Sequence, residues 1–193
     1  GKNLLVGGHN DNKTSMWRMT LDGKTTPLNI GNVSPSWGFW LDATVSKTGA
    51  IAFTCSEPNK VNELYYMAST TSKLVQLTDY NTDVSKMTLG KTETIRWKND
   101  DLKHCGIVTY PTNYEKGKKY PLVLIIHGGP NAASVEQFSR LAQILANEGY
   151  FVFEPNYRGS DNLGATYKIA IVEDAGAGPG RDVMAGLEKL KAT

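Results

Sequence analysis

The sequence predicts a mixed fold, in which an all-β first part precedes a second part of alternating strands and helices. Over residues 1–90, short strand-like runs are separated by turn signals. Similar runs return about 47–49 positions later within this part, which indicates an internal repeat. From about residue 120, buried strand-like runs alternate with an amphipathic helical pattern, which is typical of a parallel sheet with flanking helices.

The first part contains two copies of a unit made of strand, turn, strand, polar turn and a final leucine strand. The strand-like runs are 4–6, 16–19, 51–54 and 64–67, and the matching pairs are Leu4 with Ile51, Met19 with Met67 and Leu28 with Leu77. A repeat of roughly 40–50 residues built from short strands is typical of β-propeller blades. A closed propeller needs roughly 4–8 blades, so we expect residues 1–90 to form a partial propeller. A small β-sandwich with accidental spacing is the alternative.

Two strand signals open the second part. Residues 94–98 and 105–111 flank Asn99-Asp100-Asp101, which predicts a hairpin that leads into a second domain. The run Leu122–Ile126 is continuously apolar and lies between Pro121 and His127. Such a run is typical of a strand that is buried on both faces of a parallel sheet.

A helix is predicted to follow, with Ser134 as its N-cap and Gln137 completing a capping box. Its apolar face is formed by Val135, Phe138, Leu141, Ala142 and Leu145. Gly149 is a natural stop, and the run 150–153 predicts the next strand. The two strands should therefore be parallel and joined by a right-handed crossover. A last helix, capped by Asp182, should carry Val183, Met184, Leu187 and Leu190.

Composition narrows the classes of function. The chain has 193 residues with a net charge of +2, and 40% of them are hydrophobic, as in ordinary globular proteins. The densest basic patch, residues 115–119, lies in a turn-like stretch, so we expect neither nucleic acid nor a membrane as a partner. Cys55 and Cys105 form no C-x-x-C pattern, which predicts two buried free thiols and supports no metal or redox site. These features assign no cellular compartment.

The end of the predicted 122–126 strand is the candidate site. There, His127-Gly128-Gly129-Pro130 places two glycines where the backbone can approach a ligand closely. In α/β-hydrolases this position carries backbone N–H groups that stabilise a developing oxyanion. Gly129 and Gly128 are the candidate donors, whereas Pro130 has no N–H and can only shape the loop. We expect His127 to orient the loop, because a role as base needs a serine partner.

Four ordered motifs resemble the prolyl oligopeptidase family of serine hydrolases, in its acylaminoacyl-peptidase and dipeptidyl-peptidase-like branch. They are residues 95–101, 120–130, 156–160 and 182–187. The resemblance implies that residues 1–90 are the C-terminal blades of a propeller and that residues 91–193 are the N-terminal half of an α/β-hydrolase domain. It also implies serine-nucleophile cleavage of peptides or esters without a metal or cofactor, with Gly129 and Gly128 in the oxyanion loop.

The chain departs from the family pattern at the nucleophile. No G-x-S-x-G is present, and Ser160 follows Arg158-Gly159 rather than an elbow sequence. We therefore expect the catalytic Ser, Asp and His outside these residues, and the chain alone to be inactive. Its expected partners are a peptide or ester substrate and the remaining half of the hydrolase domain, from the same protein or a second chain. The alternatives are a non-catalytic binding module or a carboxylesterase.

Two further motifs have competing interpretations. Arg158 could bind a substrate carboxylate, or could pair structurally with the backbone or a carboxylate beneath the site. The stretch Gly176–Gly180 resembles a phosphate loop, but it lacks G-K-[ST] and follows no strand, which argues against nucleotide binding. The tryptophans are expected to pack rather than to mark a site.

Overall fold

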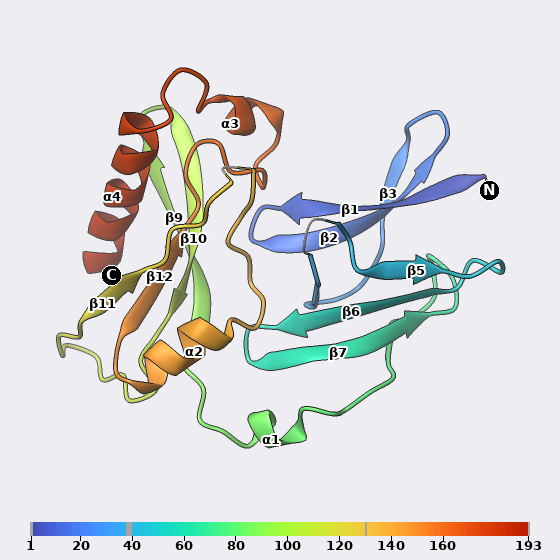
Figure 1. Cartoon of the computed structure of the whole chain (residues 1–193), viewed down its shortest axis with the longest axis horizontal. Helices are drawn as coiled ribbons and strands as arrows, with labels where there is room; N and C mark the ends of the chain where they lie inside the picture. The colour runs from blue at the N-terminus through green and yellow to red at the C-terminus, as the bar shows by residue number, and fades with distance from the viewer. Residues whose placement is uncertain (1, 38–39, 130, 193) are drawn as a thin grey trace.

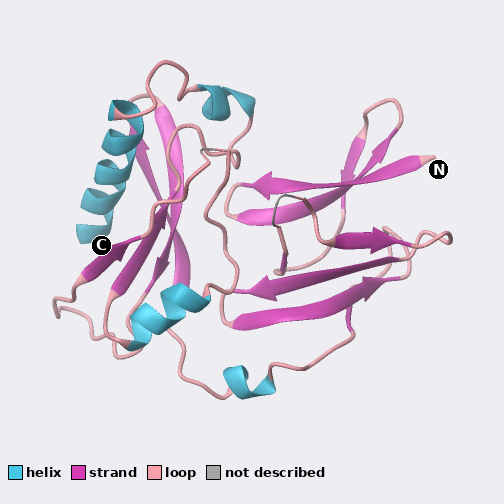
Figure 2. Cartoon of the chain, viewed as in Figure 1, coloured by secondary structure: helices cyan, strands magenta, loops and turns pink. Residues whose placement is uncertain are grey.

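The computed structural model describes residues 2–37, 40–129 and 131–192, which form two lobes (Figure 1). One lobe consists of two antiparallel sheets from the first part of the chain. The other is a mixed sheet with helices on both faces (Figure 2). The change from all-β to mixed structure that the sequence predicts is therefore confirmed.

The first sheet is an antiparallel meander. It contains β1 (Asn3–Asn10), β2 (Lys13–Thr20) and β3 (Thr25–Pro27), in that order. A turn of only two residues joins β1 to β2, and Asp11 takes a left-handed conformation there with φ of 57°. Aspartate tolerates this region better than most residues because its short side chain can bond locally.

The second sheet repeats this arrangement. Its strands are β4 (Ser34–Pro35), β5 (Ala43–Val45), β6 (Ile51–Glu57), β7 (Lys60–Met67) and β8 (Val75–Gln76). The pairs β6–β7 and β7–β8 are antiparallel, like β1–β2 and β2–β3. The repeated strand–turn–strand unit that the spacing predicts is thus present twice.

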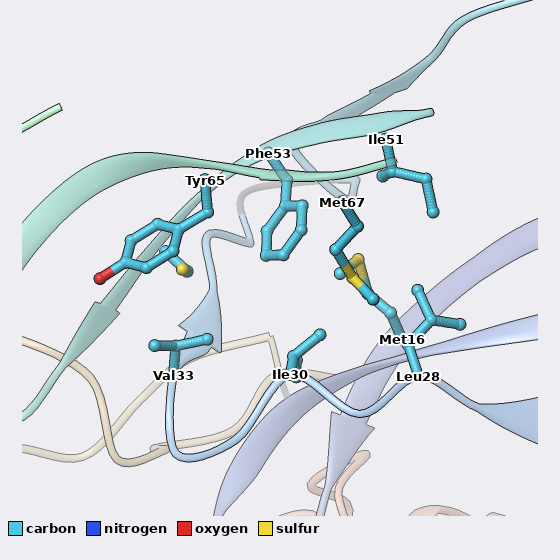
Figure 3. Packing of buried hydrophobic residues seen from close by; sticks show 9 residues of the cluster. Met16, Leu28, Ile30, Val33, Ile51, Phe53, Tyr65 and Met67 are labelled. Atoms are coloured by element: carbon cyan, nitrogen blue, oxygen red, sulfur yellow. The ribbon is translucent and has the colours of Figure 1, made fainter. Parts of the chain in front are cut away.

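An apolar cluster joins these two sheets (Figure 3). Met16 comes from β2 of the first sheet, whereas Phe53 and Met67 come from β6 and β7 of the second. Each of these side chains is at most 2% exposed. Because burial of one large apolar side chain stabilises by roughly 1.5–3 kcal/mol, this shared core holds the two sheets together.

The mixed sheet has the strand order β11-β12-β10-β9. The predicted hairpin is β9 (Thr92–Asn99) and β10 (Leu102–Thr109), which pair antiparallel. The predicted βαβ unit is β11 (Leu122–Leu124), a helix and β12 (Phe151–Pro155), and the two strands are parallel. Regular pairing of β11 ends at Leu124, two residues earlier than predicted.

Helix α2 spans Arg140–Asn147 and begins later than the capping-box pattern predicts. Its N-cap is Ser139, whose side chain accepts a hydrogen bond from the Ala142 N–H, so the prediction of Ser134 as N-cap is wrong. The predicted apolar face is right at Ala142, which is fully buried, but wrong at Leu141, which is 55% exposed while Gln143 is buried. The backbone N–H and C=O of Ser134 are instead hydrogen-bonded to the side chain of Asn156, which keeps Ser134 out of the helix.

Helix α4 spans Ala177–Lys191, so Asp182 lies inside it and is not its N-cap. The helix packs on the sheet face that carries Trp97 and Phe153, and Gly186 allows this close approach. A Cβ at Gly186 would lie 2.8 Å from the Trp97 ring. Part of the glycine-rich stretch 176–180 forms the first turn of this helix, which excludes an extended phosphate loop.

Two short helices complete the described structure. They are α1 (Thr82–Ser85), in the connection between the lobes, and α3 (Ala165–Ile169), which follows the loop after β12. Cys55 and Cys105 are free and buried, as the sequence predicts. Within the described ranges, no helix is long and apolar enough to cross a membrane.

Candidate active-site loop

Two loops meet at the carboxyl ends of β11 and β12. Because these strands are parallel and adjacent, the residues that follow each one lie at the same sheet edge. Residues 125–129 leave β11, and residues 156–162 leave β12. We call the second segment the bracing loop. Gly129 is exposed and has a φ of 128°, a conformation that favours glycine. Pro130 lies outside the described residues.

His127 is clamped by Tyr157 of the bracing loop. The two rings stack with centroids 4.6 Å apart and planes 17° apart. The Tyr157 hydroxyl donates a hydrogen bond of 2.6 Å to the His127 carbonyl oxygen. One aromatic residue therefore holds both the side chain and the backbone immediately before the two glycines.

The second contact of His127 corrects the expectation that the chain supplies no serine partner for it. His127 Nε2 lies 3.0 Å from Ser160 Oγ. Ser160 is fully buried, however, and its hydroxyl donates to the Tyr157 carbonyl oxygen at 2.7 Å. The other ring nitrogen of His127 faces the Gly128 carbonyl oxygen at 3.1 Å rather than a carboxylate. Burial lowers the pKa of His127. The geometry therefore fits a brace better than a nucleophile–base pair.

The segment after the glycines is bound to the same loop. The Asn156 side chain accepts from the Ser134 N–H at 2.8 Å and donates to the Ser134 carbonyl oxygen at 2.9 Å. The Asp161 N–H donates to the Ala132 carbonyl oxygen at 3.2 Å. These bonds hold residues 132–134 outside any helix, which explains why α2 does not begin at Ser134.

The two glycine amides are available for a ligand. Among the described residues, neither the Gly128 nor the Gly129 N–H has a hydrogen-bond acceptor. Gly129 borders an apolar hollow of about 840 Å³. Its other lining residues include Leu124, Ile126, Tyr157, Val183 and Met184. A hollow of about 720 Å³ beside α2 lies away from both loops and carries no part of this site. Free amides beside an apolar recess can hold a negatively charged oxygen while an attached apolar group is buried.

Of the two roles predicted for Arg158, the contacts of its guanidinium support the structural one. Its Nε and Nη2 donate to the two carboxylate oxygens of Asp182 at 2.8 and 2.7 Å, and Nη2 also donates to Asp100 at 2.6 Å. Burial alone would raise the pKa of Asp182, but hydrogen bonds from Arg158 and Asn99 lower it below its ordinary value. Asp182 is fully buried. The pair therefore anchors the bracing loop to α4 and engages Nε and Nη2 of the Arg158 guanidinium.

Sequence reasoning missed the contacts of Tyr157, Ser160 and Asp182. The contacts of Tyr157 and Ser160 could have been expected from the predicted parallel pairing of β11 and β12, because this pairing places the residues after each strand side by side. Among the described residues, no group of three His, Cys, Asp or Glu side chains could hold a metal ion.

Comparison with known sequences gives a family match to the last part of the chain. Residues 136–193 match the model of the prolyl oligopeptidase family. Dipeptidyl-peptidase 5 of Aspergillus fumigatus is 25% identical over 195 aligned residues, which cover 95% of this chain and 26% of that protein. A probable dipeptidyl-peptidase 5 of Aspergillus terreus is 37% identical over 83 residues, or 42% of this chain and 12% of that protein. The chain thus spans about a quarter of the A. fumigatus relative.

Comparison with solved structures shows the same fold. Acylaminoacyl peptidase of Pyrococcus horikoshii matches with a TM-score of 0.82 and 21% identity, over 97% of this chain and 29% of that one. A putative dipeptidyl aminopeptidase IV of Bacteroides ovatus matches with a TM-score of 0.76 and 20% identity, over 99% of this chain and 28% of that one. The resemblance that the motifs predict is confirmed, because residues 136–193 match the model of the prolyl oligopeptidase family.

Proposed function

We propose that this chain is part of a serine hydrolase that cleaves peptide bonds through an acyl-enzyme, and that it supplies the oxyanion loop. The observation that carries the proposal is the unbonded Gly129 N–H at the carboxyl end of β11, beside an apolar hollow. In acyl transfer, such an amide stabilises the oxygen that becomes negative in the tetrahedral intermediate. Gly128 is the neighbouring candidate donor, and His127 orients both through its contacts with Tyr157 and Ser160.

The catalytic Ser, Asp and His are proposed to lie outside these 193 residues. Two observations support this. The sequence contains no G-x-S-x-G, and the serine that reaches His127 is fully buried with its hydroxyl engaged by the Tyr157 backbone. A nucleophile must reach a substrate carbonyl, which Ser160 cannot do from this position. The remaining part of the hydrolase domain, from the same protein or a second chain, is therefore the proposed partner of this chain.

The two lobes are proposed to have different tasks. Residues 1–90 would be the C-terminal blades of a propeller that limits access to large substrates. Residues 91–193 would be the N-terminal half of an α/β-hydrolase domain. The repeated meander of β1–β3 and β6–β8 supports the first assignment, and the β11–α2–β12 unit beside the antiparallel β10 supports the second. No metal or cofactor is part of the proposal.

Peptides are the proposed substrate class because the relatives are named dipeptidyl-peptidases and the solved structures acylaminoacyl and dipeptidyl peptidases. An oxyanion loop serves ester hydrolysis equally well, so a carboxylesterase is the alternative that the test must separate. Parallel assays with two esters of the same chromophore, one of a dipeptide and one of a short-chain acyl group, would make this distinction. A kcat/KM that favours the acyl ester would replace the peptidase assignment.

A fluorophosphonate probe tests the proposal, because it labels activated serines. We expect no labelling of residues 1–193 alone and labelling of the protein that also contains the nucleophile segment. Chain pretreated with phenylmethylsulfonyl fluoride is the control for non-specific reaction. Labelling of Ser160 in the isolated chain would overturn the proposed division of the site. Absence of labelling in the complete protein would favour a non-catalytic binding module.

A further inference from the structure

The closed end of the β1–β2 hairpin contacts the bracing loop, and Figure 1 shows it facing the mixed sheet. Nδ1 of His9 lies 2.6 Å from Oδ1 of Asp161, and the two side chains are only 7% and 25% exposed. Beside this pair, the Asp11 N–H donates to the Asn162 carbonyl oxygen at 2.8 Å, and Asn162 Nδ2 donates back to the Asp11 carbonyl oxygen at 2.7 Å. The hairpin therefore holds two consecutive residues of the bracing loop.

The hairpin end is itself firmly fixed. The Asp11 carboxylate accepts two hydrogen bonds of 2.6 Å from the Arg96 guanidinium, a paired geometry that is among the stronger ionic contacts. Asn12 Nδ2 donates to Thr94 Oγ1 and to Glu136 Oε1, each at 2.9 Å. Because these contacts come from both β9 and the segment before α2, the hairpin end is a rigid support.

Ser160 and Asp161 of the bracing loop hold the two ends of the segment that contains Gly128 and Gly129. Ser160 Oγ contacts His127 Nε2 on the side before the glycines. The Asp161 N–H donates to the Ala132 carbonyl oxygen on the side after them. A shift of these two neighbouring residues would therefore displace both ends of the segment that carries the Gly128 and Gly129 amides.

We propose that His9 is a positioning residue for the Gly128 and Gly129 amides and acts through its contact with Asp161. Arg158 anchors the bracing loop on the side of α4, and among the described residues of the first lobe only the hairpin restrains Asp161. The lobes are thereby coupled at the site, since a residue of the first lobe sets the position of a loop in the second. The catalytic consequence rests on the proposed function, whereas the positioning itself does not.

The structural arm of the test uses NMR of the chain with three substitutions. His9→Ala removes the contact, and His9→Asn places an amide N–H near the position of Nδ1. Lys13→Ala is the control, because Lys13 belongs to the same hairpin but its Nζ faces Asn32 at 3.4 Å. In His9→Ala we expect shifted Gly128 and Gly129 amide resonances and about tenfold faster hydrogen exchange of the Asp161 N–H. Lys13→Ala should match the parent chain, and His9→Asn should restore both signals.

The catalytic arm uses the complete enzyme. We expect His9→Ala to lower kcat by about tenfold with little change in KM, because a misplaced oxyanion donor affects the transition state more than the bound substrate. His9→Asn should recover most of the kcat. An unchanged kcat in His9→Ala, together with shifted glycine resonances, would overturn the catalytic part of the inference.

The two proposals fail in different ways. Unchanged Gly128 and Gly129 resonances in folded His9→Ala would overturn the positioning role, whatever the activity. If His9→Ala does not fold, Asp161→Asn tests the same contact, and we expect glycine resonance shifts of the same kind. A wild-type enzyme without hydrolase activity would overturn the proposed function alone, because the resonances decide the positioning role independently.

Discussion

The imidazole of His127 and the hydroxyl of Ser160 meet at 3.0 Å, although the residues follow two different strands of the mixed sheet. The contact resembles half of a catalytic pair, but Ser160 is fully buried and its hydroxyl donates to the backbone of Tyr157. The relationship therefore joins the ends of β11 and β12 and stiffens the turn at Gly128 and Gly129.

Replacement of Ser160 should weaken the fold without removing a nucleophile. Ser160→Ala leaves His127 Nε2 and the Tyr157 carbonyl oxygen without their partner, so we expect a loss of about 1–3 kcal/mol in the free energy of unfolding. Urea titration measures this loss. Ser46→Ala is the control, because among the described residues the exposed Ser46 hydroxyl bonds only within its own turn. A loss below about 0.5 kcal/mol would contradict the bracing role.

The two glycines of the candidate site should respond differently to alanine. Gly129 has a φ of 128°, and a Cβ there would lie 3.0 Å from the Asn131 amide nitrogen, so Gly129→Ala should cost about 1–3 kcal/mol. Gly128→Ala should cost less than about 1 kcal/mol, because a Cβ at Gly128 meets nothing within 4 Å. Thermal unfolding compares the two. Equal losses would show that the turn tolerates a side chain at Gly129.

Removal of the Asp182 carboxylate should be the most destabilising of these substitutions. Asp182→Ala leaves the buried Arg158 guanidinium short of its main partner, for which we expect a loss of about 3–5 kcal/mol at neutral pH. Asp83→Ala is the matched control, because Asp83 is an exposed aspartate of α1. Chemical denaturation at pH 7 measures both. A loss similar to that of Asp83→Ala would contradict the anchoring role of Asp182.

Asp182 should also make the fold sensitive to acid. The pKa of Asp182 is lowered in the folded state. Its contribution to the free energy of unfolding is therefore complete above the unfolded pKa of about 4 and is lost as the pH falls through the folded pKa. Asp182→Asn should therefore flatten the acid limb of a stability–pH profile. An unchanged acid limb in Asp182→Asn would show that other carboxylates cause the loss of stability in acid.

Glu154 should produce the opposite slope. Glu154 of β12 lies opposite Ile107 of β10 in the strand register, and its side chain has no hydrogen-bond partner among the described residues. Burial raises its pKa to about 7. Between the unfolded value of about 4.3 and about 7, the folded state binds more protons, so the free energy of unfolding should fall as the pH rises through this window.

Glu154→Gln removes this titration. The variant should be more stable than the parent chain by about 1–3 kcal/mol at pH 8 and similar to it at pH 4. Urea titration across this range is the measurement, and Glu148→Gln, at an exposed glutamate, is the control. Parent and Glu154→Gln chains whose stabilities change equally between pH 5 and pH 8 would contradict a raised pKa of Glu154.

The local sequence predicted the elements with strong local signals. The β9–β10 hairpin follows from two β-rich runs around Asn99-Asp100-Asp101, and the stop of α2 follows from Gly149, whose φ of 86° suits glycine. The predicted start of α2 was wrong because Ser134 carries a good local capping signal. The side chain of Asn156, 22 positions away, outweighs that signal by bonding both backbone groups of Ser134.

The sequence by itself determined the change of architecture along the chain, the parallel β11–β12 unit and the family resemblance, because these depend on periodicity, turn residues and ordered motifs. Only the tertiary structure decided which side chains meet at Gly129. Tyr157 and Ser160 reach this region from the loop that follows β12, and His9 reaches it from the distant β1–β2 hairpin. Such contacts depend on the relative positions of strands and lobes, which long-range packing sets and which no local pattern encodes.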